Sequence, residues 1–295
     1  MNNFHDHLSS CAEEIDKNLV SILKKKLILD NTLKDSIYYS SIGGGKRFRG
    51  FLTIETAKFF NANNQNALNI ASAIELIHSY SLIHDDLPAL DNDDLRRSKP
   101  SNHIKYDEAT AILAGDAIQS LAFEVLSEPM KDISFERQLY LINQFSLNIG
   151  ANGMVGGQII DISSKKKDLT IKEIKQMHKL KTASLISFSC KVGAIIGGAN
   201  EEEIEAFKLY GENLGIAFQI IDDVLDKTGD IDKLGKTIGK DESNNTKTYL
   251  SHFDTEISVR KAEEFCNKAI SSLNIFDQLP ENFINALEFI TSRKS

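Results

Sequence analysis

The chain has 295 residues, 41% of them hydrophobic and 26% charged, which is the composition of a soluble globular protein with a large core. Its formal net charge of -8 argues against a general surface for nucleic acid or anionic membranes. Its three cysteines (Cys11, Cys190 and Cys266) form neither a disulfide framework nor a metal-ligand spacing. Because the N-terminus lacks a signal pattern and no apolar run approaches about eighteen residues, we expect a cytoplasmic protein without stable membrane insertion.

Helical periodicity covers most of the chain. Residues 5–25 place Leu8, Ile15 and Leu19 on one face, and Lys24–Lys26 end the segment. Similar patterns cover residues 29–41, 48–61, 66–87, 107–127, 134–152, 171–196, 202–227, 258–273 and 280–292. Residues 165–168 and 228–247 are polar and are predicted to be loops. No linker divides the chain, so we predict a single all-α domain over residues 1–295, a bundle of about ten or more helices around a central cavity.

Two of these segments, 66–84 and 183–198, are apolar on more than one face. Helices that are hydrophobic all round belong at the centre of a bundle. We therefore expect both segments in the middle of the molecule.

An acidic cluster follows the first central segment, in HDDLPALDNDDLRR at residues 84–97. Asp85 and Asp91 are six apart, which would turn them off a common face of a continuous helix. Pro88 disfavours helix at the residue before it, so the helix should end or kink near 88. We expect Asp91 to turn back towards Asp85 and Asp86, while the later Asp93 and Asp94 support the arginines behind them.

A second acidic group lies in FQIIDDVLD at residues 218–226. Asp222 and Asp226 are four apart and share one helix face, and Asp223 flanks them. Carboxylates inside an apolar stretch face a cavity or the bundle interior, where an unpaired charge is costly. Magnesium is the natural compensating cation when phosphates complete its coordination shell.

Basic residues occur at four places, and lysine and arginine are the usual partners of phosphate oxygens. They lie in GGGKRFRG at 43–50, at Arg96 and Arg97, in KLKTASL at 179–185, and at Lys236, Lys240 and Lys247. Two acidic groups with dispersed basic residues predict a site for phosphates bridged by metal ions.

Three other interpretations of these motifs fail. GGGKRFRG is not a Walker loop, because the glycine spacing is wrong and no Ser or Thr follows Lys46. GANGMVGGQ at 150–158 is not a dinucleotide fingerprint, because no strand precedes it. His84–Asp85 could suggest an HD-type metal phosphohydrolase, but the additional histidine and aspartate of that class are not evident.

The motifs together resemble those of the trans-prenyltransferases, and most closely the bacterial short-chain farnesyl diphosphate synthases. The resemblance runs from Gly43 to Tyr249, and its markers are GGGKRFR, DDLPALD with RR behind it, DEATAILAGDAIQSLAFE, GMVGGQ, KT at 181–182, FQIIDDVLD and LGKTIGKD. It implies the isoprenoid synthase fold, a homodimer, and Mg²⁺-dependent condensation of isopentenyl diphosphate with dimethylallyl or geranyl diphosphate to give farnesyl diphosphate.

The resemblance also implies a role for each matched position. Three magnesium ions with substrate bound would be held by Asp85, Asp86, Asp91, Asp222, Asp223 and Asp226. The allylic diphosphate would contact Arg96, Lys181, Thr182, Gln219, Lys236 and Lys247. Isopentenyl diphosphate would contact Lys46, Arg49, His78 and Arg97. Gln158 would lie near the reacting carbons, and the residues assigned to catalysis are Asp85, Asp91, Arg96, Lys181, Asp222 and Lys236.

Product length depends on the depth of the prenyl cavity. Tyr80 lies five residues before Asp85, roughly 7.5 Å along a helix, and Ser81 lies four before it. A bulky residue here resembles the floor of enzymes that stop at fifteen carbons, although Tyr80 could instead be an ordinary core aromatic. We expect Tyr80→Ala to let the product grow to twenty carbons.

Two positions depart from the family pattern. Gly50 stands where proline usually follows Arg49, which we expect to loosen a loop, and Ala183 replaces a glycine, which we expect to bulge slightly towards the site.

Three alternatives remain open at this stage. They are a geranylgeranyl or geranyl diphosphate synthase, a prenyl-diphosphate lyase or cyclase, and a non-catalytic subunit. A cyclase would not need the second basic set, and a non-catalytic subunit is disfavoured by two intact aspartate motifs.

Overall fold

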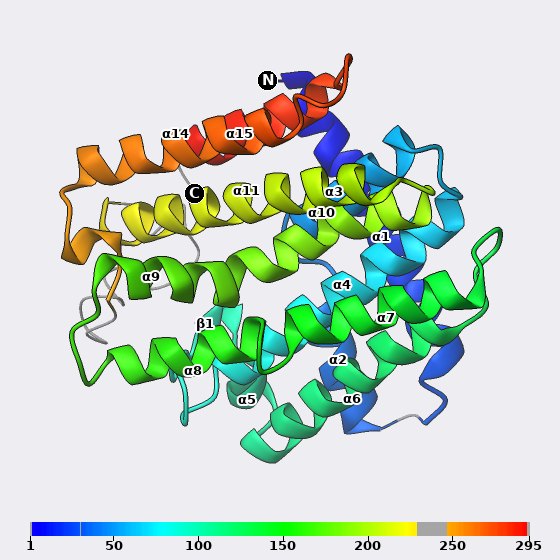
Figure 1. Ribbon diagram of the computed structural model, residues 1–295. Helices are drawn as coiled ribbons and strands as arrows, with labels where there is room; N and C mark the ends of the chain where they lie inside the picture. The colour runs from blue at the N-terminus through cyan, green and yellow to red at the C-terminus, as the bar shows by residue number, and fades with distance from the viewer. Residues whose placement is uncertain (1, 30, 229–246, 294–295) are drawn as a thin grey trace.

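The computed structural model describes residues 2–29, 31–228 and 247–293, and most of them are helical (Figure 1). The α-helices are α1 Asn2–Lys26, α2 Thr32–Ser41, α3 Phe48–Phe59, α4 Asn64–Asp85, α5 Asn102–Lys105, α6 Glu108–Ser127, α7 Phe135–Ile149, α8 Met154–Ser164, α9 Ile171–His178, α10 Ser184–Ile196, α11 Glu201–Thr228, α14 Thr255–Ser272 and α15 Glu281–Thr291. A π-helical turn, η1 Lys179–Ala183, joins α9 to α10, and a 3-10 turn, η2 Tyr249–Ser251, precedes α14. Two short antiparallel strands, β1 Leu95–Arg96 and β2 Lys99–Pro100, form a hairpin. The prediction of an all-α fold is confirmed.

Several helices begin at residues whose side chains accept hydrogen bonds from the first turn. Such caps satisfy backbone N–H groups that have no partner within the helix. Thr170 and Glu173 form a reciprocal capping box at the start of α9. Further side-chain caps include Asn31, Asn63, Asp107, Ser134 and Asp254.

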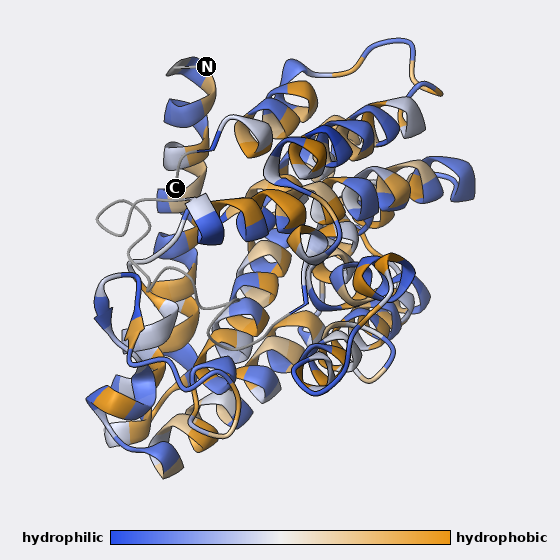
Figure 2. Ribbon diagram, turned by 90° about the vertical axis from the view of Figure 1, so that its left-hand side faces the viewer, coloured by the Kyte–Doolittle hydropathy of each residue, from blue (hydrophilic) through white to orange (hydrophobic). Residues whose placement is uncertain are grey.

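The centre of the bundle consists of α4 and α10, as the sequence predicts. Every residue of α10 from Leu185 to Ile196 is buried, and α4 packs against α3 and α6. In Figure 1 these two helices run through the middle, with α11, α14 and α15 on one side and α6 and α7 on the other. Figure 2 shows hydrophobic and hydrophilic residues interleaved along the helices, which is the amphipathic pattern of elements that pack on a shared core.

Two helices are absent from the sequence prediction, the four-residue α5 and the longer α8. Residues 154–164 form α8, although Gly156 and Gly157 are poor helix formers. Both glycines are buried, and a Cβ at Gly157 would lie 2.1 Å from the backbone nitrogen of Lys181. Close packing of α8 against η1 therefore requires glycine at a position where local propensity argues against helix.

The break at the end of α4 is confirmed. The helix ends at Asp85, and the backbone then turns back on itself. The backbone amide of Asp91 donates to the carbonyl oxygen of Asp85 at 2.9 Å. The backbone amide of Asp93 donates to the carbonyl oxygen of Asp86 at 3.0 Å. Asp91 consequently lies next to the end of the helix that carries Asp85.

Two further expectations have a structural outcome. All three cysteines are free and buried. Among the described helices, α6 alone is long and apolar enough to cross a membrane by length and composition, and the sequence had not indicated such a segment. It packs against α2, α4 and α7, and 44% of its apolar stretch is buried in the bundle.

Candidate active site

A cavity of about 640 Å³ lies between the end of α4 and the elements α3, α8, η1, α11 and α15. Charged side chains and apolar side chains from Met154, Ile159, Leu185 and Phe218 share its wall. The cavity brings together thirteen of the residues assigned from the sequence, Lys46, Arg49, His78, Tyr80, Ser81, Asp85, Arg96, Arg97, Gln158, Lys181, Thr182, Gln219 and Asp222.

Five assigned residues lie outside this lining, and a sixth cannot be placed. Asp86, Asp91, Asp223 and Asp226 do not line the cavity, although the first three directly follow lining residues, Asp85, Leu90 and Asp222. Lys247 also lies outside, with its Nζ 3.1 Å from the exposed Asp168. Lys236 lies outside the described residues.

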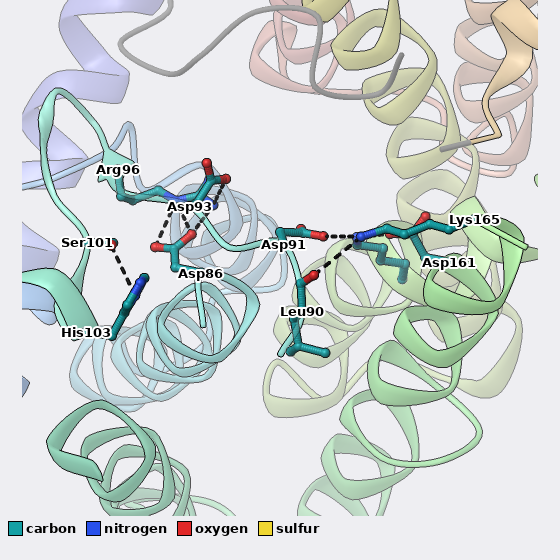
Figure 3. A network of polar contacts seen from close by, with 10 residues as sticks. Asp86, Leu90, Asp91, Asp93, Arg96, Ser101, His103, Asp161 and Lys165 are labelled. Carbon is teal, nitrogen blue, oxygen red and sulfur yellow. Dashed lines mark hydrogen bonds and ion pairs between the residues drawn. The ribbon is translucent and has the colours of Figure 1, made fainter. Parts of the chain in front are cut away.

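In the first aspartate motif, Asp86 is paired with Arg96 (Figure 3). Arg96 Nε donates to Asp86 Oδ1 at 3.0 Å, and Arg96 Nη2 lies close to the same oxygen and 3.5 Å from Asp93 Oδ2. Burial raises the pKa of Asp86, while Arg96 opposes that rise. Asp93 therefore supports the arginine as predicted, whereas the side chain of Asp94 is exposed.

Asp91 is paired with a lysine that the sequence analysis treated as part of a polar loop. Lys165 Nζ lies 3.1 Å from Asp91 Oδ1 and 3.5 Å from the carbonyl oxygen of Leu90 (Figure 3). The lysine run 165–167 was a signal of positive charge, but nothing in the sequence linked it to Asp91.

Lys181 is paired with a residue that the sequence analysis missed, Asp161 on α8. Lys181 Nζ donates to Asp161 Oδ2 at 2.5 Å, and Asp161 Oδ1 is buried without a hydrogen-bond partner. Burial raises the pKa of Asp85 to about 6; Lys181 opposes that rise, and Asp91 adds to it. Burial alone would lower the pKa of Lys181, but Asp161, Asp85 and Asp91 outweigh it and raise the pKa.

In the second aspartate motif, Asp223 ends a chain of polar contacts. Thr182 Oγ1 donates to Gln219 Oε1 at 2.6 Å, and Gln219 Nε2 donates to Asp223 Oδ1 at 2.8 Å. His178 Nε2 lies 3.4 Å from Asp223 Oδ2, and its ring stacks on Tyr249. Burial, with a smaller effect from Lys181, lowers the pKa of His178 to about 3, so the imidazole is neutral.

Asp222 forms an ion pair with Arg293, the last residue that the structure describes. Arg293 Nη2 lies 3.2 Å from Asp222 Oδ1, and the guanidinium lies 4.3 Å from the centre of the Phe218 ring. The sequence left the behaviour of Arg293 open, and the structure brings it to the cavity wall.

The second basic group gathers around His78. Burial, followed by Arg49 and Arg97, lowers the pKa of His78 well below 6.5. Burial and then Arg293 lower the pKa of Lys46. Positive side chains that depress one another's pKa in this way make a region where a bound anion would be stabilised.

The glycine run before this group leaves room for Arg97. A Cβ at Gly44 would lie 2.3 Å from Arg97 Nη1, and one at Gly45 would lie 2.6 Å from Nη2. Arg97 itself has a left-handed backbone, with φ of 53°, in the turn between β1 and β2. Ser98 shares this conformation, with φ of 59°, so the two residues form the turn of a two-residue hairpin. Arg47, by contrast, is buried against Asp16 and Glu75.

Both expectations about departures from the family pattern are wrong in detail. Gly50 lies in the first turn of α3, not in a loop, and its amide donates to Glu75 Oε1 at 2.9 Å. Proline could not make this bond, because it has no amide hydrogen. Ala183 is fully buried and lies against Gly215, where a Cβ would come 2.6 Å from the Ala183 methyl. It does not line the cavity.

The donor set fits magnesium, a hard cation that takes oxygen ligands. The carboxylates of Asp85, Asp91 and Asp222, and the unsatisfied oxygen of Asp161, lie on or near the cavity. Within the parts of the chain that are described, no three acidic, histidine or cysteine side chains converge closely enough to enclose an ion. Oxygens of a bound phosphate and of water would complete the shell.

Comparison with known proteins finds relatives in sequence and in fold. Residues 30–277 match the family model described as polyprenyl synthetase. The chain is 39% identical to farnesyl diphosphate synthase of Bacillus subtilis over 86% of each chain, and 40% identical to geranylgeranyl diphosphate synthase of Cyanophora paradoxa over 94% of this chain and 97% of that one. Its fold matches the geranyltransferase of Helicobacter pylori, complexed with magnesium and isoprenyl diphosphate, with a TM-score of 0.81, 31% identity and 96% coverage of both chains.

Proposed function

The chain belongs to the polyprenyl synthetase family, and we propose from this that it condenses isopentenyl diphosphate head to tail with dimethylallyl or geranyl diphosphate to give farnesyl diphosphate and diphosphate. The supporting observation is one cavity that carries two sets of cationic side chains. Lys181 and Arg96 lie beside the aspartate motifs, and Lys46, Arg49 and Arg97 form the other group around His78. Two diphosphates need two such groups, whereas a lyase or cyclase would need only one.

We assign the allylic diphosphate to the group at the aspartate motifs. Magnesium bound there, three ions with substrate, would neutralise charge on the departing diphosphate. The proposed magnesium ligands are Asp85, Asp86, Asp91, Asp222, Asp223 and Asp226. Preorganised donors stabilise the charge that develops on the oxygens of the same diphosphate. We assign this role to Lys181, Arg96, Thr182, Gln219, Lys236 and Lys247.

We assign isopentenyl diphosphate to Lys46, Arg49, His78 and Arg97. Its double bond attacks the allylic carbocation, near Gln158, and a proton is then lost. His78 is a poor base because its pKa is depressed, and His178 does not line the cavity. His84 also lines the cavity, but its ring is held between Tyr80 and Gly115. We assign the released diphosphate as the proton acceptor, because it forms beside the cation. Apolar walls from Leu185, Ile159 and Phe218 exclude the water that would quench the cation.

A geranylgeranyl product is the second candidate, because the relative from Cyanophora paradoxa is named for it. Tyr80 favours the shorter product, since its side chain lines the cavity from α4.

We further propose a single domain that works as a homodimer in the cytoplasm. Lys46 and Arg293, from opposite ends of the chain, line the same cavity, which supports one domain. Large apolar side chains on α6 and α7 are exposed, and such a patch is typical of a protein interface. They are Ile112, Leu113, Phe135, Leu139, Tyr140 and Leu147. Free buried thiols fit a reducing compartment.

The decisive experiment incubates the protein with isopentenyl diphosphate and each allylic primer, with and without magnesium, and reads product length by chromatography. We expect a fifteen-carbon product that depends on magnesium. Absence of elongation with every primer would overturn the proposed function.

A further inference from the structure

The side of α4 that faces α6 carries two aromatic rings in contact. Tyr80 and His84 are four residues apart, so they lie one above the other on the helix. Their ring centroids are 5.0 Å apart with an interplanar angle of 75°, an edge-to-face arrangement. Both side chains line the cavity, and His84 immediately precedes Asp85.

His84 is anchored to α6 at two points. Its Nε2 lies 3.1 Å from the carbonyl oxygen of Ile112, and because a carbonyl only accepts, Nε2 carries the proton. The ring also covers Gly115, where a Cβ would lie 2.1 Å from Nε2, 2.5 Å from Cδ2 and 2.8 Å from Cε1. The imidazole therefore occupies space that any side chain at position 115 would fill.

Gly115 lies inside α6, seven residues from its start, where glycine is less favourable than alanine. The space above it is used entirely by the His84 ring. A residue with poor helix propensity thus stands at this position, because the His84 side chain on the neighbouring helix packs there.

We propose that His84, seated on Gly115, is a positioning residue that holds the Tyr80 ring in place and thereby sets the length of the prenyl product. This inference rests on the proposed function and on Tyr80 as the floor of the prenyl cavity. Tyr80 is only partly buried and borders open space. Its phenol has a hydrogen bond to Gln119 on α6, and the His84 ring is the neighbour that packs against the aromatic ring itself and restricts its rotamer. Without the His84 ring, Tyr80 turns aside and a longer chain enters.

The test compares product length in variants of both helices. Gly115→Ala displaces the imidazole from α6, and His84→Ala removes it from α4. Each is expected to raise the ratio of twenty-carbon to fifteen-carbon product about three- to tenfold, the range given by loss of one edge-to-face ring pair. His84→Phe keeps a ring without the donor and is expected to restore most of the fifteen-carbon product. The KM for isopentenyl diphosphate should stay unchanged, because its proposed ligands are not altered.

Ser120→Ala is the matched control, since Ser120 is exposed on α6 and bonds only within that helix. Circular dichroism and thermal melting identify any variant that fails to fold. If Gly115→Ala does not fold, His84→Ala decides the question, because it only removes atoms.

Three results would overturn the inference. One is a wild-type product ratio in folded His84→Ala when Tyr80→Ala lengthens the product. Another is unchanged product length in Tyr80→Ala itself. The third is complete loss of elongation in folded His84→Ala, which would assign His84 to the metal motif. A wild-type protein that elongates no primer would instead refute the proposed function.

Discussion

The ammonium of Lys165, on the loop after α8, lies 3.1 Å from the carboxylate of Asp91 in the first aspartate motif (Figure 3). The two residues are 74 positions apart in the sequence, and both are partly buried. A magnesium ion that binds Asp91 would have to compete with this lysine for the same oxygen.

Lys165→Ala should therefore lower the magnesium concentration that half-saturates elongation. The ion pair is partly exposed, so its contribution is at most about 1 kcal/mol, which corresponds to roughly a fivefold change. A magnesium titration of initial rates measures it. Lys166→Ala, in the exposed neighbouring position, serves as control. A higher magnesium requirement in Lys165→Ala would contradict the prediction.

Asp161→Asn should reduce turnover about tenfold or more. The substitution keeps the shape of the side chain but removes the charge that raises the pKa of Lys181 and holds its ammonium at 2.5 Å. A misplaced ammonium no longer meets the developing charge on the diphosphate. Steady-state kinetics should show a lower kcat with little change in the KM for isopentenyl diphosphate. Ser163→Ala, exposed on α8, should behave as wild type.

Magnesium binding should weaken as pH falls through about 6. Burial raises the pKa of Asp85 from 3.8 to about 6, and a carboxyl must lose its proton before it binds metal. Calorimetric titration with magnesium, in the presence of a substrate analogue, measures the metal affinity. The titrations are done between pH 5 and 8, on both sides of that pKa. In Asp85→Asn this part of the pH dependence should vanish, and its persistence would argue against Asp85.

The same pKa shift predicts how the free energy of unfolding changes with pH when a chelator keeps the protein free of metal. The folded Asp85 binds a proton more tightly than the unfolded one, so low pH favours the folded state. Its unfavourable contribution to folding is absent below about pH 4, grows as pH rises towards 6 and is complete above that value. Urea denaturation of wild type and Asp85→Asn should show the difference between them growing across this window.

Arg47→Ala should destabilise the fold by about 3–5 kcal/mol, because it leaves a buried carboxylate without its partner. Arg47 Nη1 lies 3.5 Å from Glu75 Oε2, and both side chains are almost fully buried. Urea denaturation gives the free energy of unfolding. Lys58→Ala, whose side chain is half exposed, should change it by less than about 1 kcal/mol. A stable Arg47→Ala with impaired substrate binding would instead assign Arg47 to the site.

Local features of the sequence were enough for most of the helices. The spacing of apolar residues predicted the two central helices, and Pro88 predicted the break that brings Asp91 back to Asp85. These features act between neighbours in the chain, within one or two helical turns. Where packing overrode local preference, as at Gly156 and Gly157 in α8, the prediction failed.

The sequence by itself therefore determined the helical class, the two aspartate motifs and the kinds of charge that would meet them. Only the tertiary structure decided the pairs, Lys165 with Asp91, Asp161 with Lys181, His178 with Asp223, Arg293 with Asp222 and His84 with Gly115. The physical reason is that an ion pair, or the packing of a ring on a glycine, forms only when two elements bring the side chains within a few ångströms of each other. Periodicity fixes the face on which a side chain lies, but the packing of whole helices fixes what stands opposite it.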